Sequence, residues 1–277
     1  MAVVRAASLL VLALAGCASA PAPLSNADLL AAADLQYGGL DRMPSPDLRR
    51  YCMSAYWANE GQKLRACLGE IELRRKWLGV ASVKDCRENS HACDLFAREL
   101  HLGALSALDA GDYAAAIQRA DELHKMRREL AGYRYEAVDA LGILTVASAL
   151  SGIGNKEFLK DLKQFGFGPF SGLHYERIWL ARAYMAARDY ENAYTEVRRI
   201  DFGIDSLVER TAATYAPTRE ADGYRFIRGK SALETGRVEE GKAGLAQLLA
   251  APALSLEASR TGCVVSREDL ARDLQRR

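Results

Sequence analysis

The stretch AGDYAAAI, residues 110–117, decides how the rest of this sequence is interpreted, because it has the form of a tight turn between two α-helices. Gly111 stands at the break, and glycine tolerates the backbone angles that end a helix. The small residues Ala104 and Ala116 lie seven positions before the glycine and five positions after it. Two helices can approach closely only where small side chains face each other. Residues 110–117 therefore predict a closely packed helical hairpin.

The same spacing occurs five times along the chain. Each segment has a small residue, a turn seven positions later and, five positions after the turn, a residue at the start of the next helix. Four of the five turns have glycine at the break, and Trp57, Leu150 and Tyr184 are large enough to fill the space beside the contact. The segments are Ser54–Gly61–Ala66, Ala104–Gly111–Ala116, Ala147–Gly154–Leu159, Ala181–Arg188–Ala193 and Gly229–Gly236–Gly241.

These hairpins resemble the tetratricopeptide repeat, most clearly in AGDYAAAI and in ARDYENAY at residues 187–194. The resemblance implies a right-handed superhelix of TPR-like hairpins over about residues 44–251. The turns are 50, 43, 34 and 48 residues apart, and only the interval of 34 matches the period of the family. The extra residues, including 76–92 and 205–220, are expected as longer helices or irregular insertions. An irregular helical bundle is the alternative.

Composition supports an all-α chain and excludes some partners. No proline occurs between Asp47 and Gly168, alanine, leucine, arginine and glutamate are abundant, and no alternating strand pattern has a useful length. Removal of residues 1–16 would leave 36 Lys and Arg against 36 Asp and Glu. A balanced chain lacks the basic excess that binds phosphates, so nucleic acid is not an expected partner.

The amino terminus has the pattern of a targeting segment. Arg5 is followed by an uncharged run over residues 6–16, which is too short to cross a bilayer. The ending LAGC, residues 14–17, resembles the lipobox of bacterial lipoproteins, which implies cleavage before Cys17 and lipid on its thiol and new amino group. An ordinary secretory signal or a buried first helix is the alternative. Residues 17–27, with Pro21 and Pro23, then form a tether of about 3 Å per residue, and residues 28–277 form the helical domain.

Catalytic and metal-binding patterns are weak. His91, His101, His124 and His174 have no metal-ligand spacing, and Cys86 and Cys93 around His91 form at most half a zinc site. The glycine-rich segments 151–157 and 166–172 follow no expected strand, so we interpret them as turns. We therefore expect no cofactor and no metal. A cysteine-dependent enzyme that uses Cys263 remains the alternative.

Four cysteines are placed to form local bridges. Cys52 and Cys67 lie symmetrically about the expected turn of the first hairpin, and Cys86 and Cys93 flank a polar stretch that could fold back between two helices. An exported protein meets an oxidising compartment, so we predict both disulfides. Reduced cysteines in the core are the alternative. With Cys17 lipidated, five cysteines remain, which leaves at least one unpaired or intermolecular.

A partner site is expected on the first helices of the better hairpins, about 100° around each helix from the contact inside the hairpin. Stacked together, these side chains would form a groove that combines cationic and apolar surface. Such a groove suits a peptide with apolar anchors and an acidic or carboxylate end. The alternative is an ordinary solvated or inter-repeat face. The predicted lining consists of Arg98, His101, Leu105, Tyr175, Ile178, Arg182, Phe226 and Lys230.

Together these features predict a lipid-anchored, non-enzymatic scaffold or adaptor that binds an envelope protein or peptide in envelope assembly or regulation. Resemblance to bacterial lipoproteins implies the periplasmic face of a Gram-negative envelope, and Ala18 after the lipidated cysteine favours the outer membrane. Besides the enzyme, the alternative is a helical-bundle lipoprotein without a peptide groove.

Overall fold

The computed structural model describes residues 26–87, 90–129, 134–154, 156–165, 175–200, 218–250, 271–272 and 274–275. These residues form eleven α-helices and two 3₁₀ helices, and no strand is found among them, so the all-α prediction is confirmed for this part of the chain. In chain order the elements are α2 (Asn26–Tyr37), η1 (Leu40–Arg42), α3 (Ser45–Trp57), α4 (Gly61–Trp77), η2 (Val83–Arg87), α5 (Ser90–Asp109), α6 (Tyr113–Glu129), α7 (Arg134–Leu150), α8 (Lys156–Phe165), α9 (Tyr175–Ala186), α10 (Tyr190–Arg198), α12 (Thr218–Glu234) and α13 (Val238–Ala250).

The first helix of each hairpin ends in the same way, two residues before a position with positive φ. After α5, the amide of Gly111 (φ 75°) donates to Leu108 O, and the next amide donates to Ala107 O at 2.9 Å. This pair of bonds is the Schellman motif, which satisfies the last carbonyls of a helix. The positive-φ positions after α3, α5, α7, α9 and α12 are Asn59, Gly111, Gly152, Arg188 and Gly236.

Two of the predicted break residues therefore lie two positions too late. Gly61 is the first residue of α4, and the residue in the left-handed conformation is Asn59. In the third hairpin that conformation falls on Gly152 instead of Gly154. Asparagine is one of the few other residues that tolerate this region, so a search for glycine alone misplaces the first turn.

Small residues do bring the paired helices together in most hairpins. Ala104, Ala116, Ala181 and Ala193 are fully buried. In the last hairpin a Cβ atom at Gly241 would lie 2.9 Å from Gly229 O, so only glycine fits there. The first hairpin is different, because Ala66 is exposed and the buried position beside it is Cys67.

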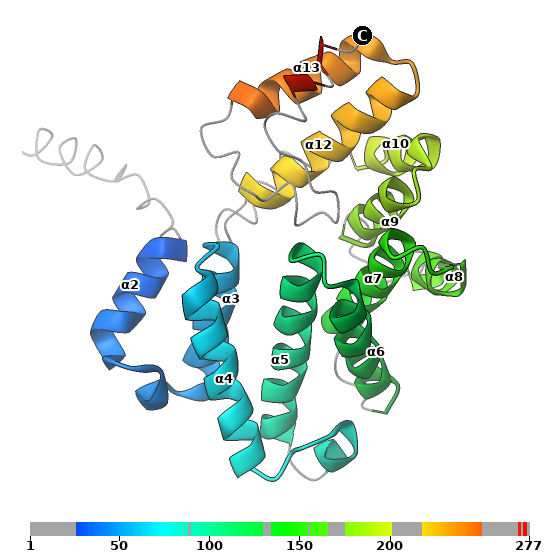
Figure 1. Cartoon of the computed structure of the whole chain (residues 1–277). Coiled ribbons are helices and arrows are strands. Elements are labelled where there is room, and N and C mark those ends of the chain that lie inside the picture. Colours follow the sequence, from blue (N-terminus) through cyan, green and yellow to red (C-terminus); the bar gives the residue numbers. More distant parts are fainter. Residues whose placement is uncertain are drawn as a thin grey trace, which may run out of the picture.

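Packing follows the order of the chain. The two helices of each pair contact each other, namely α3 and α4, α5 and α6, α7 and α8, α9 and α10, and α12 and α13. Each second helix also contacts the first helix of the following pair, and the first helices contact one another in the order α3, α5, α7, α9, α12. Figure 1 shows the described helices along an arc, from α2, α3 and α4 through α5 to α7 and on to α9, α10, α12 and α13.

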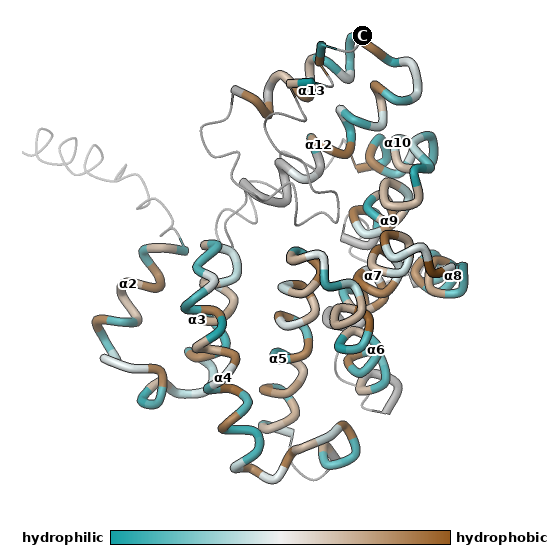
Figure 2. Tube along the Cα trace, in the orientation of Figure 1, coloured by the Kyte–Doolittle hydropathy of each residue, from teal (hydrophilic) through white to brown (hydrophobic). Residues whose placement is uncertain are grey.

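One large apolar cluster runs through most of this arc, and a smaller one surrounds η2 and the start of α5. Figure 2 shows hydrophobic residues in all parts of the described arc. Every residue of α7 from Val138 to Ser148 is buried, because α5, α6, α8 and α9 all contact this helix. The first helices α5, α7 and α9 are thereby held in a fixed mutual position.

Candidate functional site

Five side chains from the three central first helices form a continuous polar series through the core. His101 of α5 places Nε2 2.6 Å from Asp139 Oδ2 of α7. The other carboxylate oxygen, Oδ1, accepts a hydrogen bond of 2.8 Å from Trp179 Nε1 of α9. At one end Arg98 Nη1 lies 3.5 Å from His101 Nδ1, and at the other the Arg182 guanidinium lies 4.7 Å from the centre of the Trp179 ring. We call these five residues the polar series.

The middle of the polar series is buried and its ends are less so. His101, Asp139 and Trp179 are all buried, whereas Arg98 and Arg182 are half-buried. A buried carboxylate is costly unless it is paired and hydrogen-bonded. Asp139 meets this condition through one neighbour from each adjacent first helix. It therefore acts as a connector between α5 and α9.

The local sequence of α7 explains why Trp179 can reach Asp139. Gly142 lies one turn further along α7, and a Cβ atom there would lie 2.1 Å from Cδ2 of the Trp179 ring. Only a residue without a side chain lets the indole lie this close to the helix backbone. Gly142 and Asp139 thus position Trp179 together, one by leaving space and the other by accepting its N–H group.

The arginines at the two ends of the polar series can bind an anionic group. Arg182 has a buried Nε with no hydrogen-bond partner among the described residues. A guanidinium on an aromatic face is well suited to a carboxylate, since its remaining N–H groups pair with both oxygens. Arg98 lies beside the imidazole of His101. The arrangement can hold an anionic group at the surface above a rigid, buried support.

Several of the predicted groove residues are buried in the structure. His101, Leu105, Ile178 and Phe226 are buried, so they pack between helices instead of lining an open groove. Lys230 is half-buried and pairs with Glu234, one turn further along α12, at 2.9 Å. Tyr175 begins α9, but its side chain lies outside the described part. The four buried residues therefore do not line an exposed surface, and the partner groove stays a prediction.

Two members of the polar series, Asp139 and Trp179, were missed from the sequence. Asp139 is the only charged residue within the otherwise apolar run AVDALGILTVASAL, residues 137–150. A lone acid in such a run has to find a partner inside the protein. Trp179 carries no comparable signal, because an aromatic residue on a helix is ordinary core material.

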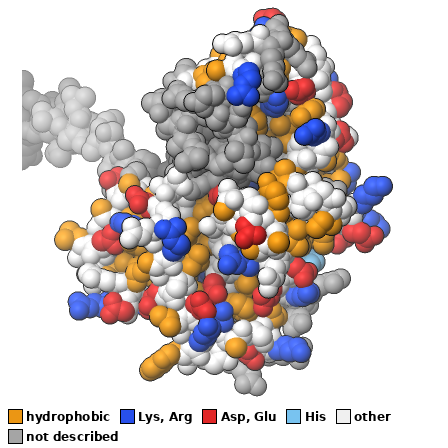
Figure 3. All heavy atoms as spheres, in the orientation of Figure 1, with side chains coloured by type: hydrophobic (Ala, Val, Ile, Leu, Met, Phe, Trp, Pro, Cys, Tyr) orange, Lys and Arg blue, Asp and Glu red, His pale blue; other side chains and the backbone are white. Residues whose placement is uncertain are grey.

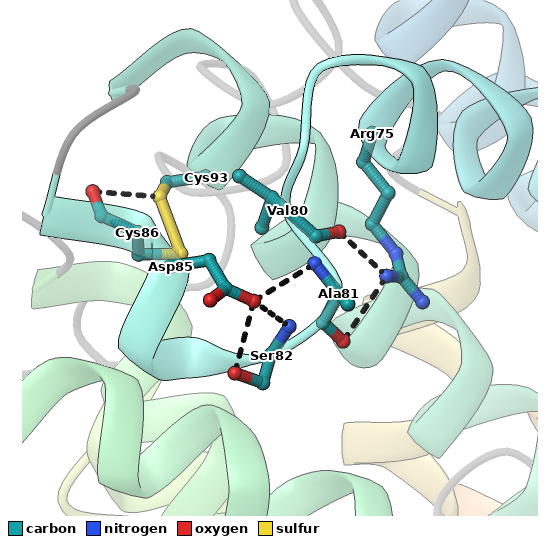
Figure 4. Close-up of a disulfide and its surroundings, with 7 residues drawn as sticks. All are labelled: Arg75, Val80, Ala81, Ser82, Asp85, Cys86 and Cys93. Atoms are coloured by element: carbon teal, nitrogen blue, oxygen red, sulfur yellow. Dashed lines mark hydrogen bonds between the residues drawn. A yellow bond between two sulfur atoms is a disulfide. The ribbon is translucent and has the colours of Figure 1, made fainter.

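A second organised region surrounds the Cys86–Cys93 disulfide, whose Cα atoms are 5.2 Å apart. Figure 4 shows this disulfide together with the residues around it. Arg75 donates to Val80 O at 2.9 Å, forms an ion pair with Glu99 and lies 4.3 Å above the Phe96 ring. The loop after α4 is therefore held by a covalent bond on one side and by a buried guanidinium on the other.

Asp85 closes this loop from within. Its carboxylate accepts hydrogen bonds from the amides of Ala81 and Ser82 at 3.0 and 2.7 Å and from the Ser82 hydroxyl at 3.0 Å (Figure 4). The bonds from Ser82, and then the one from the Ala81 amide, lower the pKa of the Asp85 carboxyl. The two cysteines considered as half of a zinc site are thus joined to each other in a structured loop.

The other predicted pair is also joined. Cys52 of α3 and Cys67 of α4 form a disulfide with Cα atoms 5.6 Å apart, within the normal range for such bonds. Both residues are fully buried. Cys17, the predicted lipidation site, and Cys263 lie outside the described residues.

A third polar region connects α10 to the last hairpin. Glu240 of α13 accepts hydrogen bonds from Tyr194 of α10 at 2.7 Å and from Arg228 of α12 at 3.0 Å. Burial by itself would raise the pKa of Glu240, but these bonds and the nearby arginines outweigh it and lower the pKa. Arg237 pairs with Glu191 through two hydrogen bonds and lies 4.1 Å above the Tyr194 ring. These contacts hold neighbouring hairpins together.

Other features give no further site. Among the described residues, no group of three or more His, Cys, Asp or Glu side chains could hold a metal ion. None of the helices described is both long and apolar enough to pass through a membrane. Figure 3 shows basic and acidic side chains interspersed over the visible face, without a large area of one sign. Comparisons with protein families, curated proteins and solved structures found no match for this chain.

Proposed function

We propose that this chain is a lipid-anchored scaffold that binds another protein or a peptide at the periplasmic face of the Gram-negative outer membrane, and that it has no catalytic role. The observation that carries the proposal is the stacking of the first helices of successive hairpins around the polar series. Stacked helical hairpins commonly present an extended surface to a partner segment. The right-handed superhelix of TPR-like hairpins belongs to this proposal.

The partner's chemistry follows from the ends of the polar series. Arg98 and Arg182 are basic groups on a support that the packing of α5, α7 and α9 keeps rigid. A partner segment with a carboxylate, either acidic side chains or a free carboxyl terminus, would pair with them. Apolar side chains of the same segment would supply most of the affinity.

The location rests on two further features. The ending LAGC at residues 14–17 resembles a lipobox, and Ala18 favours the outer membrane. The two disulfides suit an oxidising compartment outside the cytoplasm. A Cys17→Ser variant should lose labelling by a fatty-acid analogue and be released from membranes. Persistent labelling or an unchanged membrane fraction would refute the anchor.

The binding site is tested by charge reversal at Arg98 and Arg182 together, with Arg188→Glu as the matched control. Arg188 is an exposed arginine in the turn after α9. After circular dichroism shows that each variant is folded, envelope partners are cross-linked and quantified at low and high salt. The double variant should lose the partners that the control retains. Equal recovery from both variants would show that this surface is not the binding site.

Burial of His101, Leu105, Ile178 and Phe226 favours a second candidate, a helical-bundle lipoprotein without a peptide groove. In that case neither variant would change the set of partners. The enzyme alternative predicts a reactive thiol at Cys263. A survey of thiol reactivity on the folded protein distinguishes this enzyme from the two non-enzymatic candidates, because only the enzyme requires a reactive Cys263.

A further inference from the structure

The outer face of α4 carries an unusual apolar row that points away from the core. Leu73 is 63% exposed and Trp77 is 94% exposed, although both are large apolar side chains. Gly69 lies one turn before Leu73, and a Cβ atom there would meet nothing within 4 Å. Residues four apart on a helix share one face, so Gly69, Leu73 and Trp77 form a single row. Figure 1 shows that this end of α4 extends beyond α3.

We infer that this row is the contact surface for α4 of a second copy of the chain, packed antiparallel about a two-fold axis beside Leu73. Gly69 and Trp77 lie four residues on either side of Leu73. The two-fold axis therefore brings Leu73 against Leu73 of the second copy and Trp77 to the height of the other Gly69. The space left by the glycine accommodates the indole, and each surface complements itself, as a two-fold interface requires.

The charges beside the row select the same orientation. Lys76 and Glu72 pair within their own helix at 2.5 Å, and both are exposed, by 55% and 45%. In the antiparallel arrangement these residues occur in reverse order on the second helix, so each Lys76 comes close to the other Glu72. A parallel arrangement would bring Gly69 to the height of the other Gly69 and Trp77 to the height of the other Trp77, so the space beside the glycine would receive no indole. Shape and charge thus favour one geometry.

The expected interface is small. A contact through one pair of helices falls below the roughly 1,200 Å² that separates standard interfaces from weak and transient ones. The dimer should therefore form reversibly with concentration. It depends neither on the lipid anchor nor on the partner site, because Gly69, Leu73 and Trp77 are exposed on α4 and none of them belongs to the polar series.

Sedimentation equilibrium of the full chain, solubilised in detergent, tests this inference with the wild type and three variants. Trp77→Ser removes the apolar anchor, and Gly69→Gln fills the space that receives it. Leu35→Ser is the control, because Leu35 on α2 is 88% exposed and lies outside the row. The first two should weaken association by about tenfold or more, while the control stays within about twofold of the wild type.

Exchange of the Lys76 and Glu72 charges tests the antiparallel arrangement independently. Lys76→Glu and Glu72→Lys should each weaken association, and the double variant should restore it, because the reversed pair faces its reversed counterpart. Failure of the double variant to recover would overturn the antiparallel arrangement. A wild-type chain that stays monomeric at roughly 100 µM overturns the inference. So does a blue shift of tryptophan emission that appears only on addition of phospholipid vesicles and is absent from the Trp77→Ser variant, since lipid would then be the occupant.

Discussion

Replacing Gly142 by alanine tests the packing beneath the polar series with the smallest available change. The substitution adds one methyl group to α7. The ideal Cβ position lies 2.1, 2.5 and 2.5 Å from three atoms of the Trp179 ring. Carbon atoms at optimal contact are about 3.5–4.0 Å apart. The ring therefore has to move by more than 1 Å or α7 has to shift away from α9.

The magnitude follows from three opposing contributions. Alanine is a better helix former than glycine by about 1 kcal/mol, which favours the variant. Overpacking a filled core costs about 1–3 kcal/mol, and this contact is near the upper end because the Trp179 ring is buried and tied to Asp139. Displacing the ring also weakens that hydrogen bond, which costs about 1 kcal/mol or more. We expect a net loss of about 2–3 kcal/mol, or about 5–10 °C in Tm.

Gly69→Ala is the matched control, because Gly69 also lies inside a helix but has open space at the Cβ position. It should leave stability unchanged or raise it by up to about 1 kcal/mol. Both variants are measured by urea and thermal unfolding, followed by circular dichroism at low protein concentration. If Gly142→Ala is as stable as Gly69→Ala, Trp179 does not pack on Gly142, and the geometry of the polar series is wrong.

Three other perturbations have expected outcomes. Asp139→Ala leaves two buried partners unpaired and should cost about 3 kcal/mol in urea unfolding, whereas Asp121→Ala, at a surface ion pair, should cost under about 0.5 kcal/mol. In the chain-entropy model, loss of the Cys52–Cys67 bridge should lower the free energy of unfolding by about 3 kcal/mol and loss of Cys86–Cys93 by about 2 kcal/mol. Unfolding of variants with both cysteines of a pair replaced by serine measures these losses, and equal stability with and without a bridge would contradict the prediction. The pKa of the Asp85 carboxyl is lowered, so its hydrogen bonds are fully present above the usual pKa of 3.8 and are lost only as the pH falls through the lower pKa of the folded state. An NMR titration of the loop amides should show this step, and Asp85→Asn should abolish it.

Local sequence signals were sufficient for the helices and for most of the hairpins. Gly111 and Gly236 mark their turns because the left-handed conformation favours glycine. The first turn was displaced, since Asn59 occupies that conformation and Gly61 begins the next helix. Spacing alone cannot show whether a glycine follows the end of the first helix or, two residues later, begins the second one. The same error of register placed Ala66 inside the hairpin when it is outside.

The candidate site was less predictable, because it depends on contacts between helices far apart in the sequence. Arg98, His101 and Arg182 were selected from one helical face each. They are connected through Asp139 on α7, and no local sequence pattern shows which helices α7 will contact. The exposure of the face was likewise undetermined, because it depends on the distance between α5, α7 and α9. The arginines reach the surface and the imidazole between them does not.

The burial of α7 has a consequence for how the chain folds. In a linear array each hairpin touches only its neighbours, so the terminal units can open before the middle ones. Here α7 is covered by helices from before and after it in the sequence, over the whole span 138–148. A fragment that begins at α7, or one that ends at its last residue, would expose part of this apolar surface to water. The amides of α7 should therefore be the last to exchange with deuterated solvent.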